Sequence, residues 1–264
     1  MSEAAKPTAT PVPAATILIV RDGASGLEVF MVKRHHQIDF VAGALVFPGG
    51  KVHAGDLDAA LSDHMDGVAG WADEKRALGA AAIREAFEES GILFARESGG
   101  DGFVNTERLA ELDRHRHGLE KAETSLIDVL RAEKLRLALD CLVPFAHWIT
   151  PEHMPKRFDT HFFLAAAPEG HAGSHDGRES VDSVWISPNA AVADRKRWNV
   201  IFPTKLNLMK LAQADSVADA ISRARAAPPL TVTPWMEQGP DGPLLRIRDD
   251  AGYAQTSTLL RNAL

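Results

Sequence analysis

The 264-residue sequence predicts a fold of the α+β class, built from a set of strands and a set of helices. The first observation is a set of apolar stretches of strand length, bounded by turn residues, near the start and in the middle of the chain. The second is a set of segments with helical periodicity between and after these stretches. With 45% hydrophobic and 25% charged residues, the composition is ordinary for a globular protein that buries a substantial core.

The first third of the chain predicts strands followed by a long helix. Residues 1–13, rich in Ala, Pro and Thr, are expected to form a flexible leader. Residues 57–76 have a mixed character and predict short helices. A helix is expected over residues 77–90, with Gly91 as its C-cap. The strands are predicted in the stretches "ATILIVRD" and "LEVFMVKR", which flank the turn "GASG" and so form a hairpin, and in "ALVFPGG".

The rest of the chain predicts helices, three more strands and a terminal hairpin. Residues 105–139 are mostly helical in pattern, with an interruption near Gly118. A single amphipathic helix is expected over residues 204–226, and a hairpin around "GPDG" close to the end of the sequence. The three strands are predicted in "CLVPFAHWITP", "RFDTHFFLAAAP" and "VDSVWISP".

Charge, cysteine content and hydropathy disfavour several classes of function. The net charge of -7 makes nucleic acid an improbable partner for the surface as a whole. Cys141 is the only cysteine, so no intrachain disulfide forms, and we expect a buried, unreactive thiol. No apolar run reaches the ~20 residues of a membrane span, and no signal-peptide pattern is present. We therefore expect a cytoplasmic protein without a membrane partner, and the sequence leaves a monomer and a homodimer both open.

The predicted helix over residues 77–90 carries three carboxylates on one side. With about 100° per residue, Ala80, Ala86 and Phe87 fall within about 60° of Ile83. The three glutamates fall on the opposite side, at about 140° to 240°. A solvated acidic face is one interpretation, and hard oxygen ligands for Mg²⁺ or Mn²⁺ are the other. The residues on the acidic side are Glu85, Glu88 and Glu89.

A second motif lies upstream, in "FPGGKVHAGD", where a glycine pair allows backbone to approach a ligand closely. Together with "REAFEESGI" it resembles the Nudix box, in which Gly is followed by five residues, Glu, seven residues, and then Arg-Glu-apolar-x-Glu-Glu-x-Gly-apolar. Gly50 begins this pattern and Arg84 opens its second half. Asp56 stands where the family has Glu, and 27 residues separate it from Arg84, which is 20 more than the usual seven. We therefore predict one site whose box is split by an insertion.

The split box resembles the branch of Nudix hydrolases that includes the peroxisomal coenzyme A diphosphatases of animals. The stretches "VFMVKRHHQIDFVAGALVFPGGKVHAGD", "HWITPEHMPKRFDTHFFLAAAP" and "ESVDSVWISP" agree with this resemblance. It implies a Nudix fold over residues 14–212, in which a mixed β-sheet is sandwiched between helices (α/β/α), with helical insertions at about 57–76 and 97–139. Residues 213–264 would form a C-terminal extension that packs on the same domain.

The resemblance also implies a metal site and its surroundings. The acidic side of the helix would hold Mg²⁺ or Mn²⁺ together with the carbonyl of Gly49, and Arg84 and Asp56 would orient the cluster. One glutamate would act as the base, and which one stays open. In the family a further carboxylate often precedes a Trp-containing strand. Glu179, six residues before Trp185, has that place, although a surface glutamate is an equal alternative, and Asp182 is the second choice.

Candidate substrate contacts surround this cluster. Arg34, with Lys33, ends a strand that runs toward the glycine loop and would meet phosphates, with a solvated strand end as the alternative. Gly50 and Lys51 lie in the loop itself, and the cationic segment 194–198 would add charge. The remaining polar residues that we considered are His35, His36 and His53, expected in ordinary polar roles, and Arg157 and Asp159, expected as a structural ion pair.

The function that the resemblance implies is hydrolysis of a diphosphate linkage in a nucleoside diphosphate derivative, by a pyrophosphohydrolase acting on a nucleotide-type small molecule. The branch favours CoA or acyl-CoA, which would give 3′,5′-ADP and (acyl-)phosphopantetheine. NADH, ADP-ribose or a nucleotide sugar are alternative substrates. A non-catalytic nucleotide-binding module is the alternative of another class, although such modules tend to lose the box carboxylates that this sequence keeps.

Overall fold

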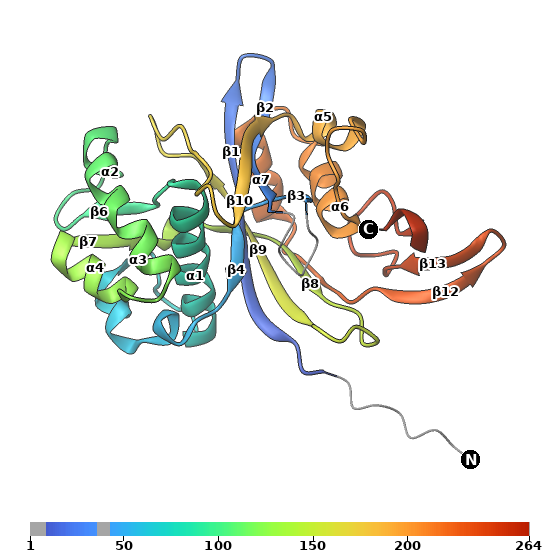
Figure 1. Ribbon diagram of the computed structural model, residues 1–264, viewed down its shortest axis with the longest axis horizontal. Helices are drawn as coiled ribbons and strands as arrows, with labels where there is room; N and C mark the ends of the chain where they lie inside the picture. Colours follow the sequence, from blue (N-terminus) through green and yellow to red (C-terminus); the bar gives the residue numbers. More distant parts are fainter. Residues whose placement is uncertain (1–8, 36–42, 264) are drawn as a thin grey trace.

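The computed structural model describes residues 9–35 and 43–263, and its centre is a mixed β-sheet (Figure 1). In hydrogen-bonding order its strands are β10, β2, β1, β9, β8 and β11, while β3 pairs with β2 and β4 pairs with β1. The sheet is mixed because β1 runs parallel to β9 and antiparallel to β2. The strand bounds are β1 (Val12–Gly23), β2 (Gly26–Arg34), β3 (Leu45–Val46), β4 (Gly49–Lys51), β8 (Val143–Ile149), β9 (Phe158–Ala166), β10 (Ser180–Ile186) and β11 (Thr231–Val232).

Helices cover both faces of this sheet because its central strands are apolar on both sides. On β1, Ile17 and Ile19 point into one hydrophobic cluster, whereas Leu18 and Val20 point into another. Helix α1 packs in the first cluster, and α5, α6 and α7 pack in the second (Figure 1). The predicted α+β fold is confirmed. The helix bounds are α1 (Asp73–Ser90), α5 (Pro188–Ala193), α6 (Phe202–Leu211) and α7 (Val217–Ala226).

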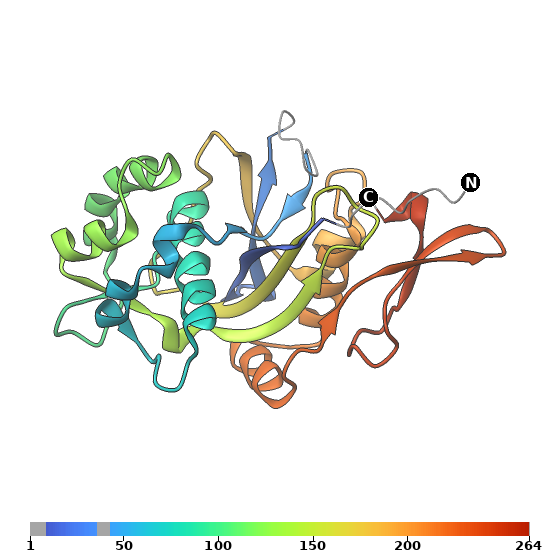
Figure 2. The ribbon, with the colours of Figure 1, turned by 90° about the horizontal axis from the view of Figure 1, so that it is seen from below.

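A smaller layer lies on the side of α1 that faces away from the central sheet (Figure 2). Its strands form a sheet in the order β5, β7, β6. Leu61, Leu119 and Leu130 from this layer are buried in the same cluster as α1, so the layer shares the core of the domain. Its elements are η1 (Ala54–Leu57), η2 (Ala59–His64), β5 (Met65–Asp66), β6 (Ala95–Glu97), α2 (Thr106–Leu112), η3 (Asp113–His115), α3 (Arg116–Glu120), α4 (Leu126–Glu133), β7 (Leu135–Ala138) and η4 (Leu139–Cys141).

After α7 the chain adds β11 to the central sheet and then forms a second small sheet, in the order β12, β13, β14. The hairpin predicted around "GPDG" is confirmed by the pairing of β12 with β13. Tyr253 ties this region to the domain, since its hydroxyl donates to Asn207 Oδ1 at 2.7 Å and accepts from Trp148 Nε1 at 2.9 Å. The bounds are β12 (Trp235–Gly239), β13 (Gly242–Arg246), β14 (Ser257–Leu259) and η5 (Leu260–Asn262).

The structure differs from the predicted elements in four places. Helix α1 begins at Asp73, one turn before the predicted start. Residues of β7 form a strand where the sequence pattern predicts helix, because they pair with both β5 and β6. The single helix predicted over 204–226 is two helices, since the Ser216 side chain accepts from Asp219 N and starts α7 anew. Of the predicted leader, residues 1–8 lie outside the described part, and Val12 already pairs with Phe158.

Candidate active site

Helix α1 brings the three predicted glutamates to the interior of the protein. The helix ends at Gly91, which adopts the left-handed conformation at φ 67° and donates its N–H to Phe87 O at 2.9 Å, as predicted for a C-cap. The exposed fractions of Glu85, Glu88 and Glu89 are only 8%, 6% and 6%. A solvated acidic face is therefore ruled out, and the carboxylates need partners or a counter-charge in place of water.

The glycine loop lies directly against these carboxylates. Strand β4 pairs with β1, which places Gly49 opposite Thr16 and Gly50 opposite Ala15. The N–H of Gly49 donates to Glu89 Oε2 at 3.0 Å. A Cβ atom on Gly50 would lie 2.3 Å from Glu85 Oε1, so any other residue there would push this carboxylate out of its position. The two halves of the split motif therefore meet in one place, despite the insertion between them.

Arg84 holds the cluster together by using all of its donors. Its Nε and Nη2 form a two-pronged contact with Asp56, at 2.9 Å to each oxygen. Its Nη1 donates to Glu85 Oε1 at 2.9 Å and to Glu88 Oε2 at 3.0 Å, and Nη2 also donates to Lys51 O at 2.9 Å. Five N–H groups thus meet five acceptors. Although burial disfavours its charged form, the contact with Asp56 and the charge of Glu85 raise the pKa of Arg84, so it stays a cation.

The cluster carries more negative charge than Arg84 offsets. Burial raises the pKa of Glu88 to about 8, even though Arg84 lowers it. Burial also raises the pKa of Glu89 well above its usual value, and the neighbouring charge of Glu85 adds to this effect. Burial likewise raises the pKa of Glu85. Raised pKa values in three adjacent carboxyls show that the site favours either protons or an additional cation.

Two predicted residues outside the box lie close enough to act on it electrostatically. The negative charge of Glu179 contributes to the raised pKa values of Glu85 and Glu89, and the positive charge of Arg34 counteracts the rise at Glu89. Their strands explain this, because β10 pairs with β2 and places Ser180 opposite Arg34, and His35 N donates to Glu179 O at 2.8 Å.

Alternation along β2 separates the two cations at its end. Phe30 and Val32 point into the cluster that contains α1, so Arg34 shares the face of α1, whereas Lys33 shares the opposite face with Met31. Asp182, the second choice for a further carboxylate, pairs with Lys33 and not with Arg34. The structure therefore brings Glu179 and Arg34 to the box and leaves Asp182 and Lys33 on the other side.

Other predicted contacts fall elsewhere. Lys51 is exposed on β4 beside the cluster, and its carbonyl is the part that touches Arg84. The cationic segment 194–198 lies on the opposite face of the sheet, where Trp198 packs in the second cluster. There it borders a cavity of about 270 Å³ that Lys205 and Arg261 also line.

Two minor expectations have mixed outcomes. Arg157 and Asp159 do not pair with each other: Arg157 donates to Thr150 O and Ala9 O, and Asp159 contacts His147 at 2.5 Å. Cys141 is half-buried and not fully buried as predicted, and its burial raises the pKa of the thiol to about 12, which favours the unreactive protonated form. Of the three histidines, His36 lies outside the described residues.

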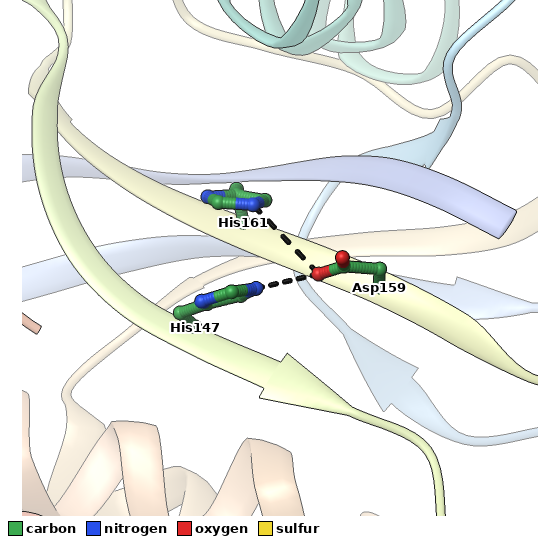
Figure 3. A group of neighbouring side chains, drawn as sticks. All are labelled: His147, Asp159 and His161. Carbon is green, nitrogen blue, oxygen red and sulfur yellow. Dashed lines mark hydrogen bonds and ion pairs between the residues drawn. The ribbon is translucent and has the colours of Figure 1, made fainter. Parts of the chain in front are cut away.

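The sequence interpretation missed a second group of ionisable side chains, His147, Asp159 and His161 (Figure 3). Asp159 and His161 are two residues apart on β9 and therefore share a face. His147 lies opposite His161 on β8. The "FDTH" alternation signals the first half of this arrangement, but the register between β8 and β9 is needed for the second half.

A family model described as the NUDT19 Nudix domain matches residues 69–207, which is more than half of the chain and includes α1. The chain belongs to this family. It is therefore a Nudix hydrolase, and the matched range contains the second half of the box but begins after the Gly49–Gly50 loop.

Relatives agree with this assignment. This Nudix hydrolase is 25% identical to "Acyl-coenzyme A diphosphatase NUDT19" of Xenopus laevis over 222 residues, which cover 69% of this chain and 58% of that protein. It is 31% identical over 166 residues to "Putative nudix hydrolase 7" of Caenorhabditis elegans, covering 62% of this chain and 48% of that protein. The chain thus spans roughly half of the length of these curated relatives.

A solved structure confirms the fold. The crystal structure of a NUDIX hydrolase from Alicyclobacillus acidocaldarius superposes with a TM-score of 0.64 at 28% identity, covering 81% of this chain and 96% of that one.

Within the described residues, the helices lack the combination of length and apolar character that crossing a membrane requires.

Proposed function

We propose that this Nudix hydrolase cleaves the diphosphate linkage of CoA or an acyl-CoA, in a reaction that depends on Mg²⁺ or Mn²⁺. Water would add across the P–O–P bridge to give 3′,5′-ADP and (acyl-)phosphopantetheine. The observation that carries the proposal is the buried carboxylate cluster of α1 against the Gly49–Gly50 loop. The similarity to an acyl-coenzyme A diphosphatase supports the choice of substrate.

The residues of the cluster fit a divalent cation. Glu88 Oε1 is buried and has no hydrogen-bond partner among the described residues, so a bound cation would give this oxygen the partner that it needs. Carboxylate and carbonyl oxygens are the donors that Mg²⁺ and Mn²⁺ prefer. When bound, such a cation neutralises charge on the phosphate oxygens and acidifies water. The residues that would hold it are Glu85, Glu88, Glu89, the Gly49 carbonyl and Glu179.

The protein's own groups would position and activate the reactants. Arg84 fixes two carboxylates of α1 to Asp56 and so keeps their oxygens in one place. A carboxylate of the cluster would take the proton of the attacking water, and the burial that raises the pKa of Glu88 to about 8 without a bound cation supports this role. Which glutamate serves as the base is decided by comparing the pH–rate profiles of the single Gln variants.

Arg34 is the best-placed group for substrate phosphate. It is half-buried on the face of α1, and its Nε has no hydrogen-bond partner among the described residues. A buried guanidinium donor without an acceptor favours an anionic ligand. Lys51 and the backbone of Gly50 lie on the same loop as the cluster and would complete this phosphate site. The inserted layer reaches the C-terminal end of α1, since Arg116 Nη2 donates to Glu88 O at 3.1 Å, and it would border the pantetheine arm.

A substrate panel with product identification tests the proposal. CoA, an acyl-CoA, NADH, ADP-ribose and a nucleotide sugar are each incubated with the protein and Mg²⁺ or Mn²⁺, with a chelator as control. We expect 3′,5′-ADP from CoA substrates, and a loss of turnover on the order of 10²–10⁴ in Glu89→Gln. Glu74→Gln, at the exposed start of the same helix, is the matched control and should keep full activity.

Each outcome decides one level of the proposal. If kcat/KM is much higher for ADP-ribose or NADH than for any CoA ester, the CoA substrate is wrong, whereas the hydrolysis of a diphosphate linkage still holds. Small and equal losses in Glu74→Gln and Glu89→Gln would remove the carboxylate cluster as the active site. A cytoplasmic location stays a prediction, which imaging of the tagged protein tests.

A further inference from the structure

The group of His147, Asp159 and His161 forms a compact set of metal-ligating atoms outside the box. His147 Nε2 lies 2.5 Å from Asp159 Oδ1, and His161 Nε2 lies 3.7 Å from the same oxygen. One ligand atom of each residue lies within 4.8 Å of the others. In Figure 3, dashed lines join one nitrogen of each imidazole to the same oxygen of Asp159, which lies beside the two rings. The side chains are 18%, 36% and 35% exposed for His147, His161 and Asp159, so ions can reach the group from solvent.

The arrangement is held in place by the sheet and by a neighbouring hydroxyl. Asp159 and His161 belong to β9, and His147 is the register partner of His161 on β8. The two rings stack with centroids 3.9 Å apart and planes 23° apart. On its far side, His147 Nδ1 contacts Thr231 Oγ1 at 2.8 Å, which fixes the ring and leaves Nε2 facing Asp159. A second contact of this kind is typical of a histidine that binds a metal.

We propose that His147 Nε2, His161 Nε2 and Asp159 Oδ1 bind a borderline divalent cation of the Zn²⁺ type. In a tetrahedral zinc site with bonds of about 2.0–2.2 Å, neighbouring ligand atoms are about 3.4 Å apart. The two separations from Asp159 Oδ1 bracket this value. Because the two rings stack, binding would also require them to splay so that the ion lies close to both imidazole planes. Imidazole nitrogens select Zn²⁺, Ni²⁺ or Cu²⁺ over the hard ions that suit the all-oxygen cluster of the box.

This site is separate from the box but lies on the same face of the sheet. Ala15 of β1 is the register partner of Gly50 on one side and of His161 on the other. Neighbouring strands are about 4.8 Å apart, so about 10 Å separates the His161 backbone from the glycine loop. With three protein ligands and a solvent-exposed side, the proposed ion would keep an open position that points to the same side of the sheet as the active site.

Metal titration of chelator-treated protein tests the proposal with a readout other than activity. Zn²⁺ binding is followed by calorimetry, and Co²⁺ is added as a spectroscopic probe, because four-coordinate Co²⁺ absorbs visible light strongly. We expect one Zn²⁺ site that weakens at least tenfold in His147→Ala, His161→Ala and Asp159→Asn, since a ligand matters at least as much as the groups that orient it. Thr231→Val should weaken Zn²⁺ binding by roughly tenfold without removing a ligand.

The controls separate this site from the box and from a folding defect. Glu88→Gln with Glu89→Gln should keep the Zn²⁺ site, and His153→Ala, which removes an exposed histidine elsewhere, should leave it unchanged. Circular dichroism checks that each variant is folded, and the near-isosteric Asp159→Asn serves if an alanine variant is not. The proposal is overturned if the wild type binds no Zn²⁺, if the His147 and His161 variants bind it equally well, or if only the box variants lose it.

Discussion

Replacing Gly50 by alanine adds a single methyl group at the point where loop and helix meet. The added Cβ would lie 2.3 Å from Glu85 Oε1, 2.6 Å from its Cδ and 2.8 Å from Oε2. Since Cβ atoms keep more than about 3.4 Å from oxygen in packed interiors, the Glu85 carboxylate must move by about 1 Å. Gly50 does not have a positive φ, so the backbone itself tolerates alanine and the effect is one of space alone.

The size of the effect follows from what holds Glu85. Its Oε1 accepts from Arg84 Nη1 at 2.9 Å, so a shift of about 1 Å weakens this contact and changes the position of Arg84 relative to Glu88. Overpacking of this kind costs about 1–3 kcal/mol of folding free energy. Misplacement of a catalytic group by about 1 Å lowers turnover by about 10²-fold. We therefore expect a protein that is folded at room temperature but has lost most of its activity.

The assay measures kcat and KM for the preferred diphosphate substrate, together with thermal unfolding. Gly55→Ala is the matched control, because a Cβ there meets nothing within 4 Å and the residue lies in the same loop region. Glu85→Asp shortens the side chain by one methylene and so makes room for the added methyl group. In the Gly50→Ala background, Glu85→Asp should therefore lower kcat much less than it does in the wild type. The reasoning is refuted if Gly50→Ala is as active as Gly55→Ala, or if the two losses simply multiply.

Two further predictions concern buried charges. Asp56→Ala leaves the Arg84 guanidinium with two donors unpaired in the interior. We expect a loss of about 3–5 kcal/mol in the free energy of unfolding and a roughly 10–100-fold loss of turnover. Denaturant unfolding and steady-state kinetics measure these two effects, and a variant as stable as the wild type would contradict the prediction. At Glu133, hydrogen bonds from His115 and then Arg108 hold the pKa at about 2, against 4.5 normally. Because this folded-state pKa is depressed, the stabilisation is complete above pH 4.5 and disappears as the pH falls toward 2. Glu133→Gln should therefore lower the free energy of unfolding by on the order of 1–3 kcal/mol at pH 7. If the difference in unfolding free energy between variant and wild type does not shrink below pH 4.5, the prediction is wrong.

Local patterns were sufficient to predict the parts of the site that are contiguous in sequence. The spacing of Arg84, Glu85, Glu88 and Glu89 on one helix and the Gly49–Gly50 pair are local features, and so is the C-cap at Gly91. Their burial is not local, because it depends on the Gly49–Gly50 loop, which its pairing with β1 holds against the helix. For this reason the helix wheel could not decide between a solvated acidic face and a metal site.

Long-range pairing accounts for the features that the sequence did not reveal. β7 has a helix-like pattern and becomes a strand only because β5 and β6 flank it. His147 and His161 lie on consecutive strands and meet only through the register of β8 and β9, which the sequence pattern does not fix. Lys33 and Arg34 are adjacent, yet alternation along β2 assigns them to opposite faces, which could be predicted only once the face of α1 was known.

The insertion does not separate the halves of the box, because the residues of the first half are already held in place at the point where the insertion begins. Strand β4 is anchored to β1, and the turn of η1 returns Asp56 so that its Oδ2 accepts from His53 N at 2.8 Å while it also accepts from Arg84. The shorter aspartate therefore reaches the guanidinium from a backbone that already lies close to it. The contact between Asp56 and Arg84 uses a residue that precedes residues 57–72, so the insertion does not interrupt it.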